Sequence, residues 1–188
     1  MLLGRVVLRY TDMPPVSAKH TETFTASLRA AGGDAIRTDA GDFRATVADA
    51  VTPPVVGAEL PFSEVALASV DDVDITLRPT LMDLRAARTG ITAAALGIAD
   101  YGSVVLRLDR GLLTEPASLF VDDHVVVIRA SDIHPDMSAA ISELGPLLRD
   151  NSESVVIATG PSATADMGAL VRGAHGPETV RVIILTDR

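Results

Sequence analysis

The feature that most constrains the fold is a set of short apolar runs rich in Val, Ile and Leu, at residues 124–128, 155–159 and 180–185. A strand with one face in water alternates apolar and polar residues, whereas a strand buried on both faces is a continuous apolar run. A helical pattern over residues 135–149 lies between the first two of these runs, and another over residues 17–31 precedes all three. The sequence therefore predicts an α/β fold, with a largely parallel sheet covered by helices.

The remaining elements follow from shorter patterns and from turn residues. Gly32-Gly33 is expected to end the first helix, and Pro53-Pro54 to stop the next. Further helices are predicted over residues 42–51, 81–88 and 92–98, and further strands over 35–37, 55–60, 74–77 and 104–106. Because the chain has neither an internal repeat nor a low-complexity linker, we expect a single domain over residues 1–188, in which residues 1–60 form a less regular helical cap.

Composition limits the classes of site. Hydrophobic residues make up 47% of the chain, which is typical of a packed core. The sequence contains no Cys. That excludes a disulfide framework, a thiolate-bound zinc ion and an iron–sulfur cluster held by thiolates of this chain. We therefore expect no cofactor to be bound by this chain itself.

The charge of the chain argues against nucleic-acid binding. The net charge is −9, and phosphate recognition needs clustered Lys and Arg. Asp is far more frequent than Glu, and Lys19 is the only lysine in the chain. Short, strongly hydrated carboxylates with almost no ammonium groups are expected where high salt screens repulsion. The composition predicts a halophilic protein.

The hydropathy pattern predicts a cytoplasmic protein. No apolar run approaches the roughly 18 residues of a membrane span. Residues 1–10 are apolar but include Arg5 and Arg9, and they lack the cleavage site of a signal peptide.

The strongest local motif is residues 160–166, Gly-Pro-Ser-Ala-Thr-Ala-Asp, directly after the apolar run 155–159. If that run is a parallel strand, the motif lies at a carboxyl end, where open α/β sheets bind ligands. Gly160 permits close backbone approach, and Ser162 and Thr164 supply hydroxyl groups. A helix starting there would present free N–H groups to an anion. In the alternative interpretation, Ser162 only caps that helix and Asp166 favours its dipole.

Two further turns contain residues that suit a binding site. Arg172 precedes Gly173-Ala174-His175-Gly176-Pro177, in which an accessible His is placed for acid/base work or for an anion contact. The alternative is a His that only fixes the turn. Asp100-Tyr101-Gly102-Ser103 joins a predicted helix to a strand, and Gly102 permits close approach to a ligand there. On pattern alone, this segment fits a turn with a solvated Asp equally well.

Several other sites are not supported. Ser162, Asp166 and His175 lack the Gly-x-Ser-x-Gly elbow of a nucleophilic triad. The Gly160 loop lacks the lysine of a Walker motif, and no Gly-x-Gly-x-x-Gly follows a strand. The four His residues lie far apart, so nothing indicates a metal site. We expect His124 to begin a strand, and Asp122-Asp123 to be solvated turn charges.

Three stretches together resemble the LUD family, which includes the lactate-utilisation C proteins. The block from Gly160 to Asp166, with 170–177 and the run 180–185, is similar to the most distinctive motif of the family. Residues 90–104 resemble its central "GVT…AETGTL" motif, and residues 124–133 resemble the segment between the two. The resemblance covers roughly residues 80–188. Asp100-Tyr101 stands where the family usually has Glu-Thr. Ala163 stands where the family usually has Arg, and Arg172 is the candidate to supply the positive charge of that missing arginine.

The resemblance implies a fold similar to the NagB/RpiA/CoA-transferase group, and a role in oxidising L-lactate to pyruvate. It also implies partner subunits that carry the iron–sulfur clusters. On this hypothesis the chain binds a small carboxylate and belongs to a lactate-oxidising complex, with His175 and Asp166 as the catalytic candidates. The anion-binding candidates are Gly160, Ser162, Thr164, Asp100, Gly102, Arg172 and Gly176.

Two other functions stay open. The first is a non-catalytic module that assembles or stabilises the iron–sulfur subunits, with structural Gly-rich turns. The second, by fold analogy alone, is an enzyme for phosphorylated sugars or CoA esters. Ala163 and the shortage of Lys weaken the second. Convergence of the Gly160 loop, His175 and Asp100 on one pocket would favour a ligand site, whereas an apolar surface patch would favour assembly.

Overall fold

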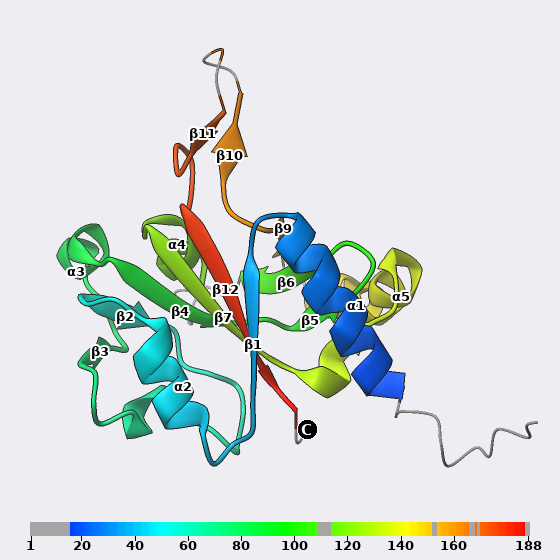
Figure 1. The fold of residues 1–188 in the computed structure, drawn as a ribbon, viewed down its shortest axis with the longest axis horizontal. Helices are drawn as coiled ribbons and strands as arrows, with labels where there is room; N and C mark the ends of the chain where they lie inside the picture. The colour runs from blue at the N-terminus through cyan, green and yellow to red at the C-terminus, as the bar shows by residue number, and fades with distance from the viewer. Residues whose placement is uncertain (1–15, 109–113, 152–153, 166–167, 169, 187–188) are drawn as a thin grey trace, which may run out of the picture.

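The central sheet is parallel throughout, as the apolar runs predict. A computed structural model describes residues 16–108, 114–151, 154–165, 168 and 170–186. Six strands lie in the order β1-β12-β7-β4-β2-β3, and every neighbouring pair is parallel (Figure 1). Their bounds are β1 Asp34–Thr38, β2 Val55–Gly57, β3 Ile75–Thr76, β4 Thr89–Ala93, β7 Asp123–Arg129 and β12 Thr179–Leu185. The predicted α/β class is confirmed.

The neighbouring strands β7 and β12 are buried on both faces. On one face, Val126 and Ile184 pack with Phe24 and Leu28 of helix α1 (Val16–Ala30). On the other face, alternate residues of the same strands, including Val127 and Ile183, pack with Phe43 and Val47 of helix α2 (Phe43–Ala50). The continuous apolar runs therefore supply two cores, one on each side of the sheet.

A second, mixed sheet lies beside α1. It comprises β5 (Leu96–Ile98), β6 (Ser103–Leu108), β8 (Ile133–His134) and β9 (Ser154–Thr159), in the order β8-β5-β6-β9. Helix α5 (Met137–Asn151) packs against β5 and β6 through Ala140 and Leu144. The short helices α3 (Leu81–Ala86) and α4 (Thr114–Leu119) lie at the other end of the central sheet (Figure 1). None of the helices within the described residues is long and apolar enough to cross a membrane.

Two predicted elements are wrong. Residues 92–98, expected as a helix, form the end of β4 and all of β5. Their Ala-rich sequence favours a helix, but Ile91 and Thr92 are fully buried on opposite faces of the sheet, and this tertiary packing overrides the local preference. The first 60 residues, expected as a less regular cap, include β1 and β2 of the central sheet. Helix α4 was not predicted.

The strand over residues 154–159 differs from its prediction in direction and in burial. β9 pairs antiparallel with β6, at one edge of the mixed sheet. Val156 and Ile157 are 38% and 40% exposed. No helix follows the strand: residues 163–164 form β10, which pairs antiparallel with β11 (Val171–Arg172) in a hairpin that projects from the rest of the molecule (Figure 1). An apolar run specifies neither the direction of a strand nor whether both of its faces are covered.

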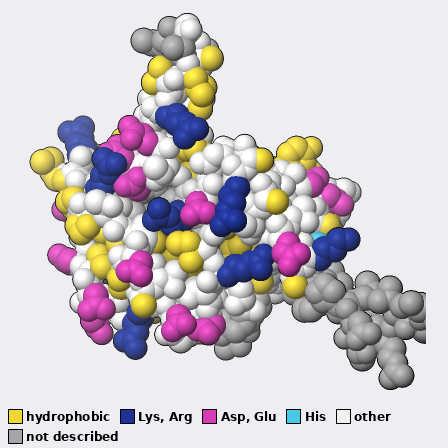
Figure 2. Space-filling model, viewed as in Figure 1, with side chains coloured by type: hydrophobic (Ala, Val, Ile, Leu, Met, Phe, Trp, Pro, Cys, Tyr) yellow, Lys and Arg dark blue, Asp and Glu magenta, His cyan; other side chains and the backbone are white. Residues whose placement is uncertain are grey.

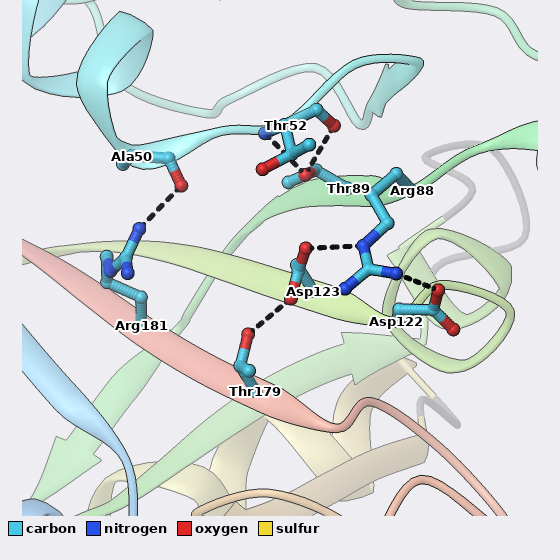
Figure 3. A network of polar contacts seen from close by, with 8 residues as sticks. All are labelled: Ala50, Thr52, Arg88, Thr89, Asp122, Asp123, Thr179 and Arg181. Carbon is cyan, nitrogen blue, oxygen red and sulfur yellow. Dashed lines mark hydrogen bonds and ion pairs between the residues drawn. The ribbon is translucent and has the colours of Figure 1, made fainter.

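The amino edge of the central sheet is held together by polar contacts (Figure 3). Thr89, Asp123 and Thr179, each the first residue of its strand, lie in one register row. Arg88 donates from Nε to Asp123 at 3.0 Å and from Nη1 to Asp122 at 2.8 Å, and Thr179 donates to Asp123 at 2.7 Å. Asp122 and Asp123 are therefore ion-pair partners rather than the solvated turn charges that we expected. The pKa of Arg88 is raised, chiefly by the hydrogen bond from its side chain to Asp123.

Candidate functional site

A cavity of about 270 Å³ lies at the opposite, carboxyl edge of the central sheet. Open α/β sheets bind their ligands at this edge. The lining comes from the segment after β2, from the end of β4 and the residues that follow it, from β6, from the start of α4, and from the end of β7 and the 3-10 helix after it: Glu59, Pro61, Phe62, Ala93, Ala94, Ala95, Arg107, Thr114, Arg129 and Asp132. Because the strands are parallel, side chains that lie far apart in the sequence meet here.

Arg129 is the most firmly held charged side chain of this cavity. It is the last residue of β7, and it donates from Nε and Nη2 to the two carboxylate oxygens of Glu64, at 2.7 and 3.0 Å. Its guanidinium carbon lies 4.8 Å from the ring centre of Phe62. The paired hydrogen bonds and the aromatic face fix the plane of the guanidinium.

The Glu64–Arg129 pair is ionised. Its hydrogen bonds from Arg129 lower the pKa of Glu64 to about 2, and they raise the pKa of Arg129. The pair uses Nε and Nη2 of Arg129, and no hydrogen bond from the described residues occupies Nη1. With Arg107 and the hydroxyl-bearing Thr114 also in the lining, the cavity offers guanidinium donors suited to a carboxylate.

A second cavity, of about 250 Å³, contains several of the residues that the sequence analysis singled out. Gly160, Ser162, His175 and Gly176 all line it, so the two C-terminal motifs do converge. The rest of the lining is mainly apolar: Leu106, Ser118, Leu119, His124, Val156, Ala158, Thr159, Pro161, Pro177 and Val180. Among the described residues of this lining there is no Arg, Lys, Asp or Glu.

The backbone of the Gly160 loop is not arranged as the predicted anion cradle. The N–H of Ser162 donates to the carbonyl of Pro177 at 2.9 Å, and the N–H of Gly173 donates to the carbonyl of Ser162 at 3.1 Å. These bonds hold the base of the projecting hairpin. The N–H groups of Ser162 and Gly173 are therefore used within the fold and do not serve an anion. The prediction of a helix N-terminus there is wrong for the same reason: the chain turns into β10.

Two of the three glycines of the predicted site, Gly160 and Gly102, have structural roles. Gly160 has φ +63°, and a Cβ on it would stand 2.5 Å from the carbonyl oxygen of Ala31. Gly102 has φ +64°, and a Cβ on it would overlap the backbone of Ser27 and Leu28. Both positions therefore require glycine so that these turns can approach the last turns of α1.

The other predicted residues that the structure describes do not line either cavity. Asp100 is exposed in the turn between β5 and β6, Thr164 lies in β10, and Arg172 is exposed in β11 beside Gly32. Asp166 lies outside the described residues. The roles assigned to these residues stay predictions. Within the described part of the chain, no three His, Asp or Glu side chains group as metal ligands would.

His124 was expected only to begin a strand, yet it lines the second cavity. It is 3% exposed, and its Nε2 lies 2.8 Å from Oγ1 of Thr92. Burial lowers its pKa to about 4, so the ring is neutral at neutral pH. Its sequence position, between two Asp residues and a β-branched run, gave no sign of this.

Comparison with protein families decides the identity of the fold. The model of the LUD domain matches residues 21–185. The chain belongs to the LUD domain family. A crystal structure of a DUF162 family protein from Deinococcus radiodurans, at 1.70 Å resolution, matches this LUD domain with a TM-score of 0.67. The two chains are 18% identical, and the match covers 92% of this chain and 99% of the other, which shows a shared fold.

Several curated proteins resemble part of this LUD domain. The lactate utilization protein C of Macrococcus caseolyticus is 30% identical over 106 residues, which are 54% of this chain and 46% of that protein. The protein of the same name from an Exiguobacterium species is 32% identical over 105 residues, covering 54% and 45%. That from Deinococcus radiodurans is 28% identical over 106 residues, covering 55% and 49%. This LUD domain thus spans about half the length of the curated relatives that it matches.

Proposed function

We propose that this LUD protein is a component of an L-lactate utilisation system, in which lactate is oxidised to pyruvate, and that it binds a small carboxylate. Membership of the family and similarity to proteins named lactate utilization protein C support the metabolic role. The chain has no Cys, and in this proposal iron–sulfur subunits, as its partners, carry the electrons.

The observation that supports carboxylate binding is the fixed guanidinium of Arg129 at the carboxyl edge. Glu64 and Phe62 hold Arg129 in one orientation, so little side-chain entropy is lost when a ligand binds. Arg107 and Thr114 add donors from two other elements. A cavity of about 270 Å³ is large enough to admit a small carboxylic acid.

A second candidate function is assembly of partner subunits, and the edge strand β9 favours it. Residues 154–159 include no charge and no Pro, although such residues usually protect an exposed edge. Leu119 and Val156, which line the second cavity, are 46% and 38% exposed. Hydrophobic side chains also lie along the projecting hairpin (Figure 2), where Leu170 is 68% exposed. An apolar edge of this kind suits a partner strand.

Calorimetric titration in high KCl with L-lactate, D-lactate, pyruvate and glycolate tests carboxylate binding. We expect binding to weaken in Arg107→Gln, and also in Arg129→Lys, which keeps the charge but loses the paired donors. The matched control Arg85→Gln alters an exposed arginine of α3 and should bind as wild type.

The same titration locates the site. Retained binding in Ser162→Ala and His175→Ala supports the carboxyl-edge cavity, whereas loss in these two variants alone moves the site to the second cavity. No heat with any of the four acids, from protein whose circular dichroism shows it to be folded, overturns carboxylate binding and leaves assembly as the better candidate.

A further inference from the structure

We infer that the carboxyl-edge cavity selects acids with a hydrogen-bond donor beside the carboxylate, and so prefers a 2-hydroxy acid to the corresponding 2-oxo acid, because Asp132 lines it as an acceptor together with Arg107 and Arg129. This inference rests on the proposed function, and it names the ligand class of the same site.

Two of the charged side chains that line the cavity, Arg129 and Glu59, have a partner of opposite charge. Arg129 is neutralised by Glu64, and Glu59 lies 3.5 Å from Arg78, with Oε1 and Nη2 as the nearest atoms. Asp132 is the other carboxylate among the described residues of the lining. Its carboxylate has no ion pair within 4.0 Å among the described residues, although its charge contributes to the raised pKa of Arg129.

The position of Asp132 is set by the same strand that positions Arg129. It closes the 3-10 helix Ala130–Asp132, which follows β7 directly. The hydroxyl of Ser131 donates to its Oδ1 at 3.0 Å, and the described residues give Oδ2 no hydrogen bond. A half-buried carboxylate with one open oxygen therefore lines the cavity beside the guanidinium of Arg129.

An ionised carboxylate accepts hydrogen bonds and donates none. A 2-hydroxy acid that places its carboxylate on the arginines can donate its hydroxyl proton to Asp132. The 2-oxo acid presents a carbonyl oxygen at that place, so two acceptors meet and neither is satisfied. Sites built to receive a ligand hydroxyl discriminate strongly against analogues that lack it.

The test compares L-lactate, pyruvate and propionate, which has no substituent at carbon 2, by calorimetric titration. We expect wild type to bind L-lactate about 10-fold more tightly than pyruvate or propionate, a modest factor because Asp132 is only half buried. In Asp132→Asn, affinity for L-lactate should fall about 10-fold, while affinity for pyruvate is retained or rises, because the amide can donate to its carbonyl. Asp132→Ala should also lose the preference.

The control is Asp49→Asn, an exposed position on α2, which should leave all three affinities unchanged. Equal weakening of L-lactate and pyruvate in Asp132→Asn overturns the inference, as does equal affinity for the two acids in wild type. Either result would overturn only the preference for 2-hydroxy acids, and the proposal that the protein binds a carboxylate would stand. Failure of the proposed function looks different, since then no acid binds or the Arg107 and Arg129 variants bind as wild type.

Discussion

Gly102, in the turn between β5 and β6, lies directly against the backbone of Leu28 in α1. A Cβ at this position would overlap the amide nitrogen of Leu28, and the residue also has φ +64°. Backbone touches backbone here, so a larger residue cannot be accommodated by a rotation of side chains. This contact joins the mixed sheet to the helix that covers the central sheet.

We therefore expect Gly102→Ala to cost about 3 kcal/mol of unfolding free energy or more, from overlap added to left-handed strain. The matched control is Gly168→Ala, with φ +81° and nothing within 4 Å of the added Cβ. Strain alone should cost about 1 kcal/mol there. Urea unfolding measures both, and equal losses would show that the contact with Leu28 is unimportant.

Stability should fall as the pH drops through the titration of His124. Burial lowers its pKa to about 4, from the ordinary 6.5 that it regains on unfolding. Between these values the unfolded chain binds the extra proton, so this contribution to stability is complete above pH 6.5 and is lost towards pH 4. The loss amounts to about 3 kcal/mol. Urea unfolding at pH 7.5 and 4.5 should show a smaller pH effect in His124→Gln, and an unchanged one in His175→Gln. An identical pH effect in wild type and His124→Gln would refute the assignment.

Glu64 should stabilise the fold only where it is ionised. Its pKa is lowered from 4.5 to about 2 by Arg129, so its contribution is present above pH 4.5 and is lost as the pH falls through 2. We expect wild type to melt above Glu64→Gln at pH 6, and the difference to shrink between pH 4.5 and 2. Glu22→Gln, at an exposed site on α1, controls for the loss of one charge. A difference that stays constant to pH 2 would contradict the ion pair.

Salt should stabilise the protein. A net charge of −9, with 25 acidic residues against 16 basic ones, makes the folded chain repel itself at low ionic strength. Molar KCl screens this repulsion, so the melting temperature should rise with KCl concentration. A flat response would rule out adaptation to high salt. An equal rise in sucrose of matched osmolality would assign the effect to general solute exclusion instead.

The parts of the fold that could be predicted are those in which burial and local preference agree. β7 and β12 could be predicted as strands because both of their faces are covered, which gives continuous apolar runs. α1 could be predicted as a helix because one of its faces meets the sheet. Residues 92–98 were predicted wrongly because Ala favours a helix locally, while packing around Ile91 and Thr92 requires strands. Residues that contact a given segment across the fold cannot be inferred from that segment alone.

The candidate site shows the same division. The rule that ligands lie at the carboxyl edge was applied to the strand before Gly160, whose antiparallel direction its residues do not reveal. Applied to the run 124–128, the same rule leads to Arg129 and then Asp132. Arg107 and Glu64 carry no such signal, because only the folded chain brings them to this edge.

The contacts of Arg88 at the amino edge have a consequence for how such a protein can diverge. Asp123, the first residue of β7, accepts from Arg88, which directly precedes β4, and from Thr179, the first residue of β12, and the cavity lies at the other end of the sheet. Substitutions around the cavity therefore leave the strand register untouched. A lineage built this way can exchange ligand-binding side chains one at a time and acquire a new specificity on an unchanged framework.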